Sequence, residues 1–223
     1  MTLDPIQIRV LGALIEKEIA TPENYPLSLN ALVNACNQRS SRDPVMNLTE
    51  DEVRQALHTL EDMGLTAVVR DSRVAKYEHR IRTVLNLRRD ETAVLCLLIL
   101  RGPQTPGELR ARADRLYSFD GLDAVESTLG RLMAPAASSD ENGGAQDLRP
   151  LVVMLPRQPG SREARYAHLL GGAVEATVQD SSGEVRQASA AGPTLAARIA
   201  GLEAEVAALR EAVARIEERL AGS

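Results

Sequence analysis

The 223-residue chain holds few of the side chains that build covalent frameworks or aromatic surfaces. It has two cysteines, Cys36 and Cys96, no tryptophan, one phenylalanine and four tyrosines. Two isolated cysteines provide neither a disulfide framework nor a zinc cluster, so we expect a protein of the reducing cytoplasm. The few aromatic residues are not interleaved with basic ones, which argues against a stacking platform for single-stranded nucleic acid.

Long apolar runs and an excess of positive charge are missing as well. The longest apolar run, residues 93–100, is much shorter than the roughly 20 residues that span a bilayer. The first residues lack the basic and apolar regions of a signal peptide, so we expect no membrane partner. The 26 basic and 31 acidic residues give a net charge of −5. A chain of that charge does not coat nucleic acid by bulk attraction, so phosphate contacts would need local basic clusters.

The same order of elements is predicted twice along the chain. Apolar residues at i, i+4 and i+7 mark one helix face in residues 53–60 and again in residues 125–132. A β-prone run follows each helix, and then a predicted strand that contains the motif Tyr-x-His, at Tyr77–His79 and at Tyr166–His168. The shared order and the shared motif indicate an internal repeat.

Capping signals place two more helices before the third helix of the first half. Asp4, followed by a proline, begins the first helix, and residues 28–38 form the second. Thr49 and Glu52 form a capping box for the third helix, which Gly64 ends.

The second half repeats this arrangement. Residues 91–101 form its first helix, and a capping box at residues 105–108 opens its second helix. Asp120 or Asp123 starts the third helix. Both halves therefore carry three helices followed by two strands.

Three helices followed by a two-stranded hairpin are the order of a winged helix, a variant of the helix-turn-helix fold. We therefore predict a mainly α fold with small β-hairpins, composed of two tandem winged-helix domains. The first spans residues 1–85 and the second residues 88–170, with wings at 70–76 and 156–165. Residues 134–149, rich in Gly, Ala and Ser, are predicted to be an insertion in the second domain.

The C-terminal part of the chain has a different pattern. Residues 171–193 are rich in Gly, Ser and Ala without periodicity, which predicts a linker. Residues 194–221 repeat apolar positions every seven residues, which predicts a parallel coiled coil that joins two chains as a homodimer. A single amphipathic helix that packs on its own domain is the alternative. The predicted dimer contacts are Leu195, Ile199, Leu202, Val206, Leu209, Val213, Ile216 and Leu220.

Four segments carry a family resemblance. Residues 21–38 and 42–50, together with residues 101–110 and 159–166, closely resemble the YceH family of bacterial proteins. The resemblance implies two winged-helix domains and a C-terminal coiled coil, which agrees with the interpretation from the residues. It implies no reaction, because that family is known by its sequence and fold.

No residue pattern predicts catalysis, a metal or a cofactor. A thiol–imidazole pair of Cys36 with His58 or His79 is conceivable, but no spacing requires the groups to meet. His79 and His168 lack further metal ligands nearby, so hydrogen-bonded structural roles are expected. Neither GxxxxGK[ST] nor GxGxxG follows a predicted strand. We expect a protein that is not an enzyme and that uses no cofactor or metal.

Double-stranded DNA and another protein are the expected partners. The third helix of a winged helix usually enters the major groove. Here both third helices begin with acidic residues, at 50–52 and at 120–126, which repel phosphates. Basic residues lie instead on the first wing, on the loop before the third helix and on the second helix of the second half. The candidate contacts are Arg39, Arg42, Arg70, Arg73, Lys76, Arg110 and Arg112.

Two functions remain open. The basic clusters and the common use of the fold favour a dimeric DNA-binding protein of the transcription-regulator type. The acidic third helices favour a protein-interaction scaffold, comparable to adaptors of chromosome organisation, and this comparison rests on the fold alone. For any one basic cluster, a solvated face with ordinary ion pairs is the alternative. Asn37 and Asn47, in the loop before the third helix, either bind a partner or satisfy the loop backbone.

Overall fold

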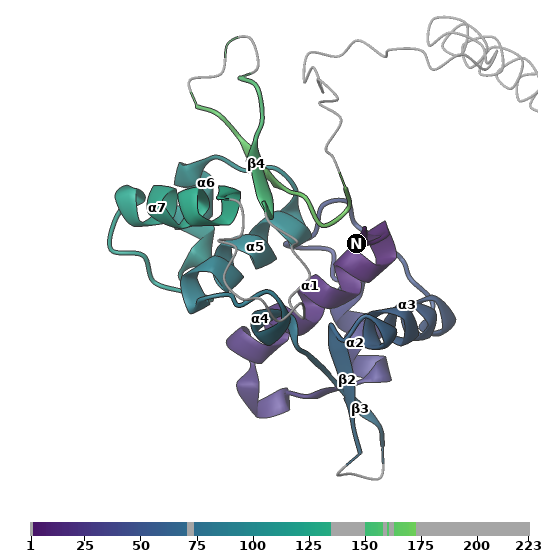
Figure 1. The fold of residues 1–223 in the computed structure, drawn as a ribbon. Helices are drawn as coiled ribbons and strands as arrows, with labels where there is room; N and C mark the ends of the chain where they lie inside the picture. The colour runs from purple at the N-terminus through teal and green to yellow at the C-terminus, as the bar shows by residue number, and fades with distance from the viewer. Residues whose placement is uncertain (1, 71–73, 135–149, 158–159, 161–162, 173–223) are drawn as a thin grey trace, which may run out of the picture. The chain divides into compact units, whose positions relative to one another are not determined.

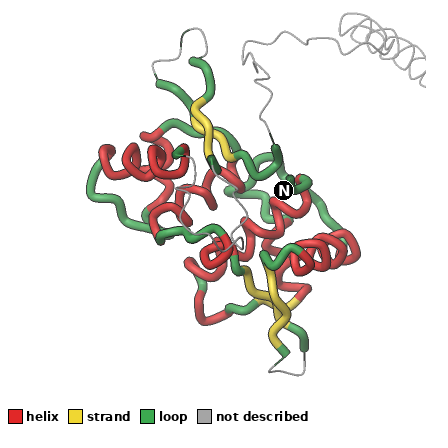
Figure 2. Tube along the Cα trace, viewed as in Figure 1, coloured by secondary structure: helices red, strands yellow, loops and turns green. Residues whose placement is uncertain are grey.

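The structure is a computed structural model that describes residues 2–70, 74–134, 150–157, 160 and 163–172. These residues are mainly helical with small antiparallel sheets (Figures 1 and 2). The prediction of a mainly α fold with small hairpins is therefore confirmed. Residues 135–149 of the predicted insertion and the whole predicted coiled coil lie outside the described residues, so those assignments stay predictions.

The first half begins with α1 (Pro5–Ala20), a short 3-10 helix η1 (Pro22–Asn24) and β1 (Leu27–Ser28). Two further helices follow, α2 (Leu29–Cys36) and α3 (Glu50–Asp62). The strands β2 (Thr66–Val69) and β3 (Lys76–His79) complete the half. The order in the sheet is β1-β3-β2, and both pairs of neighbours are antiparallel.

Local chemistry explains where these helices begin and end. The Asp4 carboxylate accepts from the backbone N–H of Ile6 and Gln7, and the Gln7 side chain returns to the Asp4 N–H. Thr49 and Glu52 form the same reciprocal box at the start of α3, as the sequence predicts. These bonds satisfy backbone donors that have no partner inside the helix.

The second half follows after the short helix α4 (Ile81–Val84). It contains α5 (Arg89–Arg101), α6 (Pro106–Ala113) and α7 (Leu122–Met133). The antiparallel strands β4 (Val152–Met154) and β5 (Tyr166–His168) end it. The predicted repetition of three helices and two strands is confirmed, whereas η1, β1 and α4 were not predicted.

One apolar core extends through both halves, and α1 and α5 form its centre. All residues of α5 from Glu91 to Leu100 are buried. Side chains of α5 pack directly against the backbone of α1 at Gly12, where an added Cβ would lie 2.5 Å from Ile99 Cγ2. The β2–β3 hairpin and the β4–β5 hairpin lie on opposite sides of this helix pair (Figure 1).

Candidate functional site

The exposed face of α3 is acidic. Glu50, Asp51 and Glu52 stand at its start, and all three are exposed. Arg54 is the basic residue on this turn, and its guanidinium binds Glu50 at 2.5 Å and Asp51 at 2.6 Å. Because Arg54 is engaged by two carboxylates, this helix presents excess negative charge where a groove-reading helix would meet phosphates.

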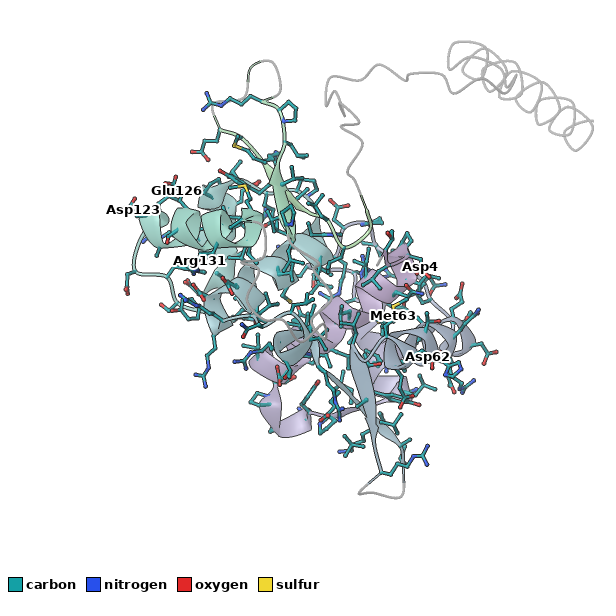
Figure 3. The ribbon with its side chains drawn as sticks, viewed as in Figure 1. Asp4, Asp62, Met63, Asp123, Glu126 and Arg131 are labelled. Carbon is teal, nitrogen blue, oxygen red and sulfur yellow. The ribbon has the colours of Figure 1, made fainter. Side chains whose placement is uncertain are left out.

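The corresponding helix of the second half, α7, has the same character. Asp123 and Glu126 are exposed on its outer side (Figure 3). Arg131 instead turns toward α5, where its guanidinium pairs with Asp90 and, at 3.2 Å, with Glu91. Its charge is used to hold α7 against α5.

The β2–β3 hairpin, which is the predicted first wing, carries basic residues at one end. Val69 pairs with Lys76 in the β2–β3 register, and Arg70 follows Val69 at the same end of the hairpin. Arg70 is exposed and Lys76 is half-buried. Neither forms an ion pair with a carboxylate of the described residues. Arg73, the third basic residue predicted for this wing, lies outside the described residues.

The structure gives Arg42 an internal role in place of the predicted contact role. Its side chain is fully buried, and its Nη2 lies 2.6 Å from Glu16 Oε2. Nε and Nη2 also donate to the carbonyl of Ala35, at 3.2 and 2.9 Å. Burial raises the pKa of the Glu16 carboxyl, but the hydrogen bond and charge of Arg42 outweigh burial, so this pKa is lowered. Arg42 is therefore not available to a phosphate, whereas Arg39, three residues earlier, is exposed.

The loop of residues 37–48, which carries Arg39, is held from inside. The Asn37 side chain donates to the carbonyl of Leu48 at 2.8 Å and accepts from its N–H at 2.7 Å. Arg9 is buried in α1, and its guanidinium donates to the carbonyls of Cys36 at 3.1 Å and of Pro44 at 2.5 Å. Asn37 thus satisfies the loop backbone, which was one of its two predicted roles.

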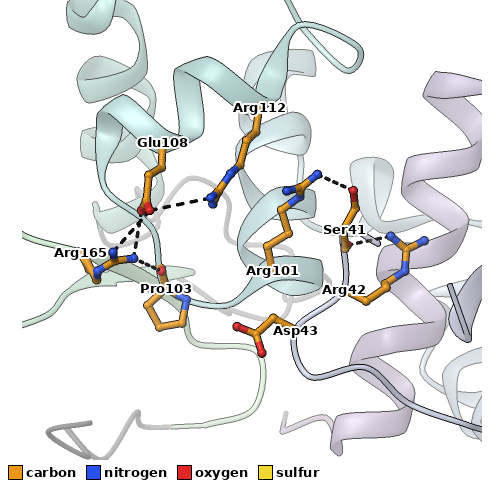
Figure 4. Close-up of a pocket in the computed structure, with 8 residues that line it drawn as sticks. All are labelled: Ser41, Arg42, Asp43, Arg101, Pro103, Glu108, Arg112 and Arg165. Atoms are coloured by element: carbon orange, nitrogen blue, oxygen red, sulfur yellow. Dashed lines mark hydrogen bonds and ion pairs between the residues drawn. The ribbon is translucent and has the colours of Figure 1, made fainter. Parts of the chain in front are cut away.

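A polar pocket of about 310 Å³ lies where this loop meets the second half. The residues that line it are Ser41, Arg42, Asp43, Arg101, Pro103, Glu108, Arg112 and Arg165 (Figure 4). They include four arginines and two carboxylates. Because Arg42 is paired with Glu16, the other three arginines exceed the carboxylates of Asp43 and Glu108 by one positive charge. Of the predicted contacts, only Arg42 and Arg112 belong to it; Arg110 is exposed on the same helix, α6.

Glu108 is the shared carboxylate of this pocket. Arg165 Nη1 lies 2.9 Å from its Oε2, and Arg112 Nη2 lies 3.8 Å from its Oε1. The same carboxylate accepts from the Thr105 N–H at 2.9 Å and caps α6. Burial raises the pKa of Glu108, and the Thr105 bond and the two arginines lower it further than burial raises it.

Arg101, at the end of α5, has no such carboxylate. Its Nη2 donates to Ser41 Oγ at 2.5 Å, and no carboxylate of the described residues forms an ion pair with it. Burial lowers its pKa, and so does the positive charge of Arg112. Sequence reasoning missed Arg101 and Arg165, because their pocket joins segments that lie far apart in the chain, around Ser41, Arg101 and Arg165.

Among the groups considered for a thiol–imidazole pair, Cys36 and His79 are buried and His58 is at the surface. Burial raises the pKa of the Cys36 thiol to about 12, so this thiol is protonated at neutral pH. His79 Nε2 lies 2.8 Å from Glu18 Oε2, whereas His58 is exposed. The hydrogen-bonded role predicted for His79 is confirmed, whereas the same prediction for His168 is not, since its Nδ1 is buried without a hydrogen-bond partner among the described residues. In the part of the chain that the structure describes, His, Cys, Asp and Glu form no group of three that could hold a metal ion.

None of the described helices has both the length and the apolar character that crossing a membrane requires.

Comparison with known proteins shows the family of the chain. The family model described as "Protein of unknown function, DUF480" matches residues 3–161. A UPF0502 protein of Koribacter versatilis is 57% identical over 171 residues, which cover 76% of this chain and 74% of that protein. UPF0502 proteins of Chromobacterium violaceum and Solibacter usitatus are 47% and 48% identical, and the matches cover 99% and 94% of this chain and 93% and 94% of those proteins. The chain therefore belongs to the bacterial protein family called DUF480 or UPF0502, in agreement with its resemblance to the YceH proteins.

Proposed function

We propose that the chain is a tandem winged-helix protein that binds duplex DNA through its first wing and the loop of residues 37–48. The order of helix, short strand, two helices and two strands in the first half supports the winged-helix assignment. The observation that carries DNA binding is a set of exposed or half-buried basic residues without ion pairs in the described chain. The members of this set on the predicted first wing and on the 37–48 loop are Arg39, Arg70 and Lys76, which we call the wing–loop surface.

The proposed contacts are to phosphates. Third helices with exposed Glu50–Glu52 and Asp123 repel the DNA backbone, so they do not supply the attraction. The wing–loop surface offers three cations per chain, and each phosphate contact changes the salt slope by about −0.9. A single chain would therefore bind with a slope near −2.7. The predicted coiled coil over residues 194–221 would bring two such surfaces to one duplex and raise the avidity.

Fluorescence anisotropy of a labelled random duplex tests this proposal. The full-length protein is titrated at about 50 and about 200 mM salt, where a slope of −2.7 predicts roughly 40-fold weaker binding. Replacing all three wing–loop residues by glutamine should abolish most of this salt dependence. The matched control replaces three exposed arginines elsewhere, Arg88, Arg89 and Arg115. Equal losses in both triple variants, or no binding at low salt, would contradict the proposal.

A protein-interaction scaffold of the chromosome-organisation adaptor type, without direct DNA binding, is the second candidate. The specific observation in its favour is the acidic exposed face of α3, where Arg54 is neutralised by Glu50 and Asp51. An acidic helix face fits a basic protein surface better than it fits DNA. The same titration separates the candidates, because a scaffold of this type leaves the duplex unbound at low salt.

We further propose a non-enzymatic, cytoplasmic homodimer that uses no cofactor. Protonated, buried Cys36 and carboxylate-bound His79 support a structural role for these groups. Buried free thiols at Cys36 and Cys96 suit a reducing compartment. The dimer rests on the heptad pattern alone.

A further inference from the structure

The pocket between the 37–48 loop and the second half is a separate feature from the wing–loop surface. Ser41 comes from the loop, Arg101 from the end of α5, and Arg112 from α6. Arg165 lies immediately before β5 (Figure 4). The pocket is therefore assembled from both halves of the described fold, and none of the wing–loop residues lines it.

Positive charge in this pocket exceeds the negative charge. The Glu108 carboxylate forms ion pairs with Arg165 and Arg112 and also caps the start of α6. Arg101 has a serine hydroxyl as its hydrogen-bond partner and no carboxylate among the described residues. A guanidinium in such a place retains donors for an anion. The pKa of Arg101 is lowered because burial and the positive charge of Arg112 both disfavour its charged form.

We propose that this pocket binds a small phosphate-bearing anion, held by Arg101 and Arg112 against the Ser41 hydroxyl. Planar guanidinium groups match the oxygen geometry of phosphate and form charge-assisted hydrogen bonds with it. The volume of about 310 Å³ is at the small end of ligand pockets. Among the described residues, the lining contains no aromatic side chain, so recognition comes from the phosphate and not from a stacked base.

The bound anion would connect the two halves of the fold. It would balance charge on α5 and α6 while it contacts the loop through Ser41. A ligand that binds only the folded protein raises the melting temperature in proportion to the logarithm of its concentration. Anion binding to this pocket is measured without DNA, so the result is independent of the proposed DNA-binding function.

Isothermal titration calorimetry with pyrophosphate tests the site. Full-length protein is titrated at constant ionic strength, with chloride as the balancing anion, and saturable binding of one pyrophosphate per chain is expected. Arg101→Met should weaken binding at least about tenfold, because one or more charge-assisted hydrogen bonds are lost. Arg110→Met is the matched control, since Arg110 is exposed on α6 outside the pocket, and its affinity should equal that of the wild type.

Two further variants keep the test decisive. Arg112→Met should also weaken binding, and Arg101→Lys, which keeps the charge but loses the planar fork, should bind more weakly than wild type. A melting curve for each variant checks folding, and Arg112→Met and Arg101→Lys carry the test if Arg101→Met does not fold. Absence of saturable binding, or equal affinity in the pocket variants and in Arg110→Met, would overturn the proposal. Loss of duplex binding in Arg101→Met with pyrophosphate affinity unchanged would also overturn it, because the pocket would then belong to a DNA interface.

Discussion

Replacement of Gly12 by alanine tests the close packing that joins the two halves. Gly12 lies in the buried part of α1, opposite Ile99 and Leu100 of α5. An added Cβ would lie 2.5 Å from Ile99 Cγ2 and 2.9 Å from Leu100 Cδ2. Carbon atoms in contact normally lie about 3.5–4.0 Å apart. A methyl group therefore fits only if α1 and α5 move apart or a side chain changes rotamer.

The expected magnitude follows from two opposing effects. Overpacking of a buried site costs about 1–3 kcal/mol, and the upper end applies here because β-branched Ile99 has one favoured rotamer in a helix. Alanine in place of glycine gains about 1 kcal/mol of helix propensity. The net loss is about 2 kcal/mol in the free energy of unfolding, which lowers the melting temperature by roughly 4–8 °C for a domain of this size.

Thermal and urea unfolding of the full-length protein provide the measurement. Gly130→Ala is the matched control, because Gly130 is a helical glycine of α7 with no atom within 4 Å of an added Cβ. That substitution should raise the free energy of unfolding by about 0.5–1 kcal/mol. A Gly12→Ala protein that melts at or above the wild-type temperature would refute the close approach of α1 and α5.

Three other predictions concern oligomeric state, pH and an ion pair. Deletion of residues 194–223 should convert a dimer to a monomer in sedimentation. An unchanged number of chains per particle would contradict the predicted coiled coil. Burial lowers the pKa of His168 to about 4, so the unfolded chain binds a proton at this residue between about pH 6.5 and 4 while the folded chain does not. Stability should therefore fall as the pH is lowered through that window, by up to about 1.4 kcal/mol per unit. His168→Gln should flatten this dependence and His58→Gln should not, as denaturant midpoints at each pH would show. Glu16→Gln leaves the buried Arg42 without its counter-charge, so it should cost about 3 kcal/mol in urea unfolding; a loss below about 1 kcal/mol would mean that the pair behaves like an exposed one.

The elements that the sequence predicts well are those with local signals. The boxes at Thr49 and at Thr105 lie within four residues of chain, and the structure forms both of them. The ends of α2 were less well predicted, since residues 28–38 were expected and Leu29–Cys36 are helical. β1 and α4 were missed because each is four residues or shorter, too brief for a periodic pattern.

The candidate site was less predictable because burial decides which charges remain free. Arg39 and Arg42 look equivalent in the sequence, yet one is exposed and the other is paired with Glu16. That pairing joins positions 26 apart, on α1 and on the 37–48 loop, and no local pattern indicates it. Arg101 was hidden in the same way, since a basic residue in the last turn of a helix is explained by the helix dipole alone.

The buried arginines give the 37–48 loop a defined shape. Arg9 binds carbonyls at Cys36 and Pro44, at the two ends of the segment that carries Arg39 and Ser41. Because the segment is held at both ends, the backbone that carries these two side chains is kept in place although the loop has no apolar core of its own. Arg39 is exposed on this hydrogen-bonded segment, while Ser41 Oγ accepts from Arg101 Nη2 at 2.5 Å. The 37–48 loop thus contributes one residue to each proposed surface, Arg39 to the wing–loop surface and Ser41 to the pocket, and the buried Arg9 holds the backbone that carries both.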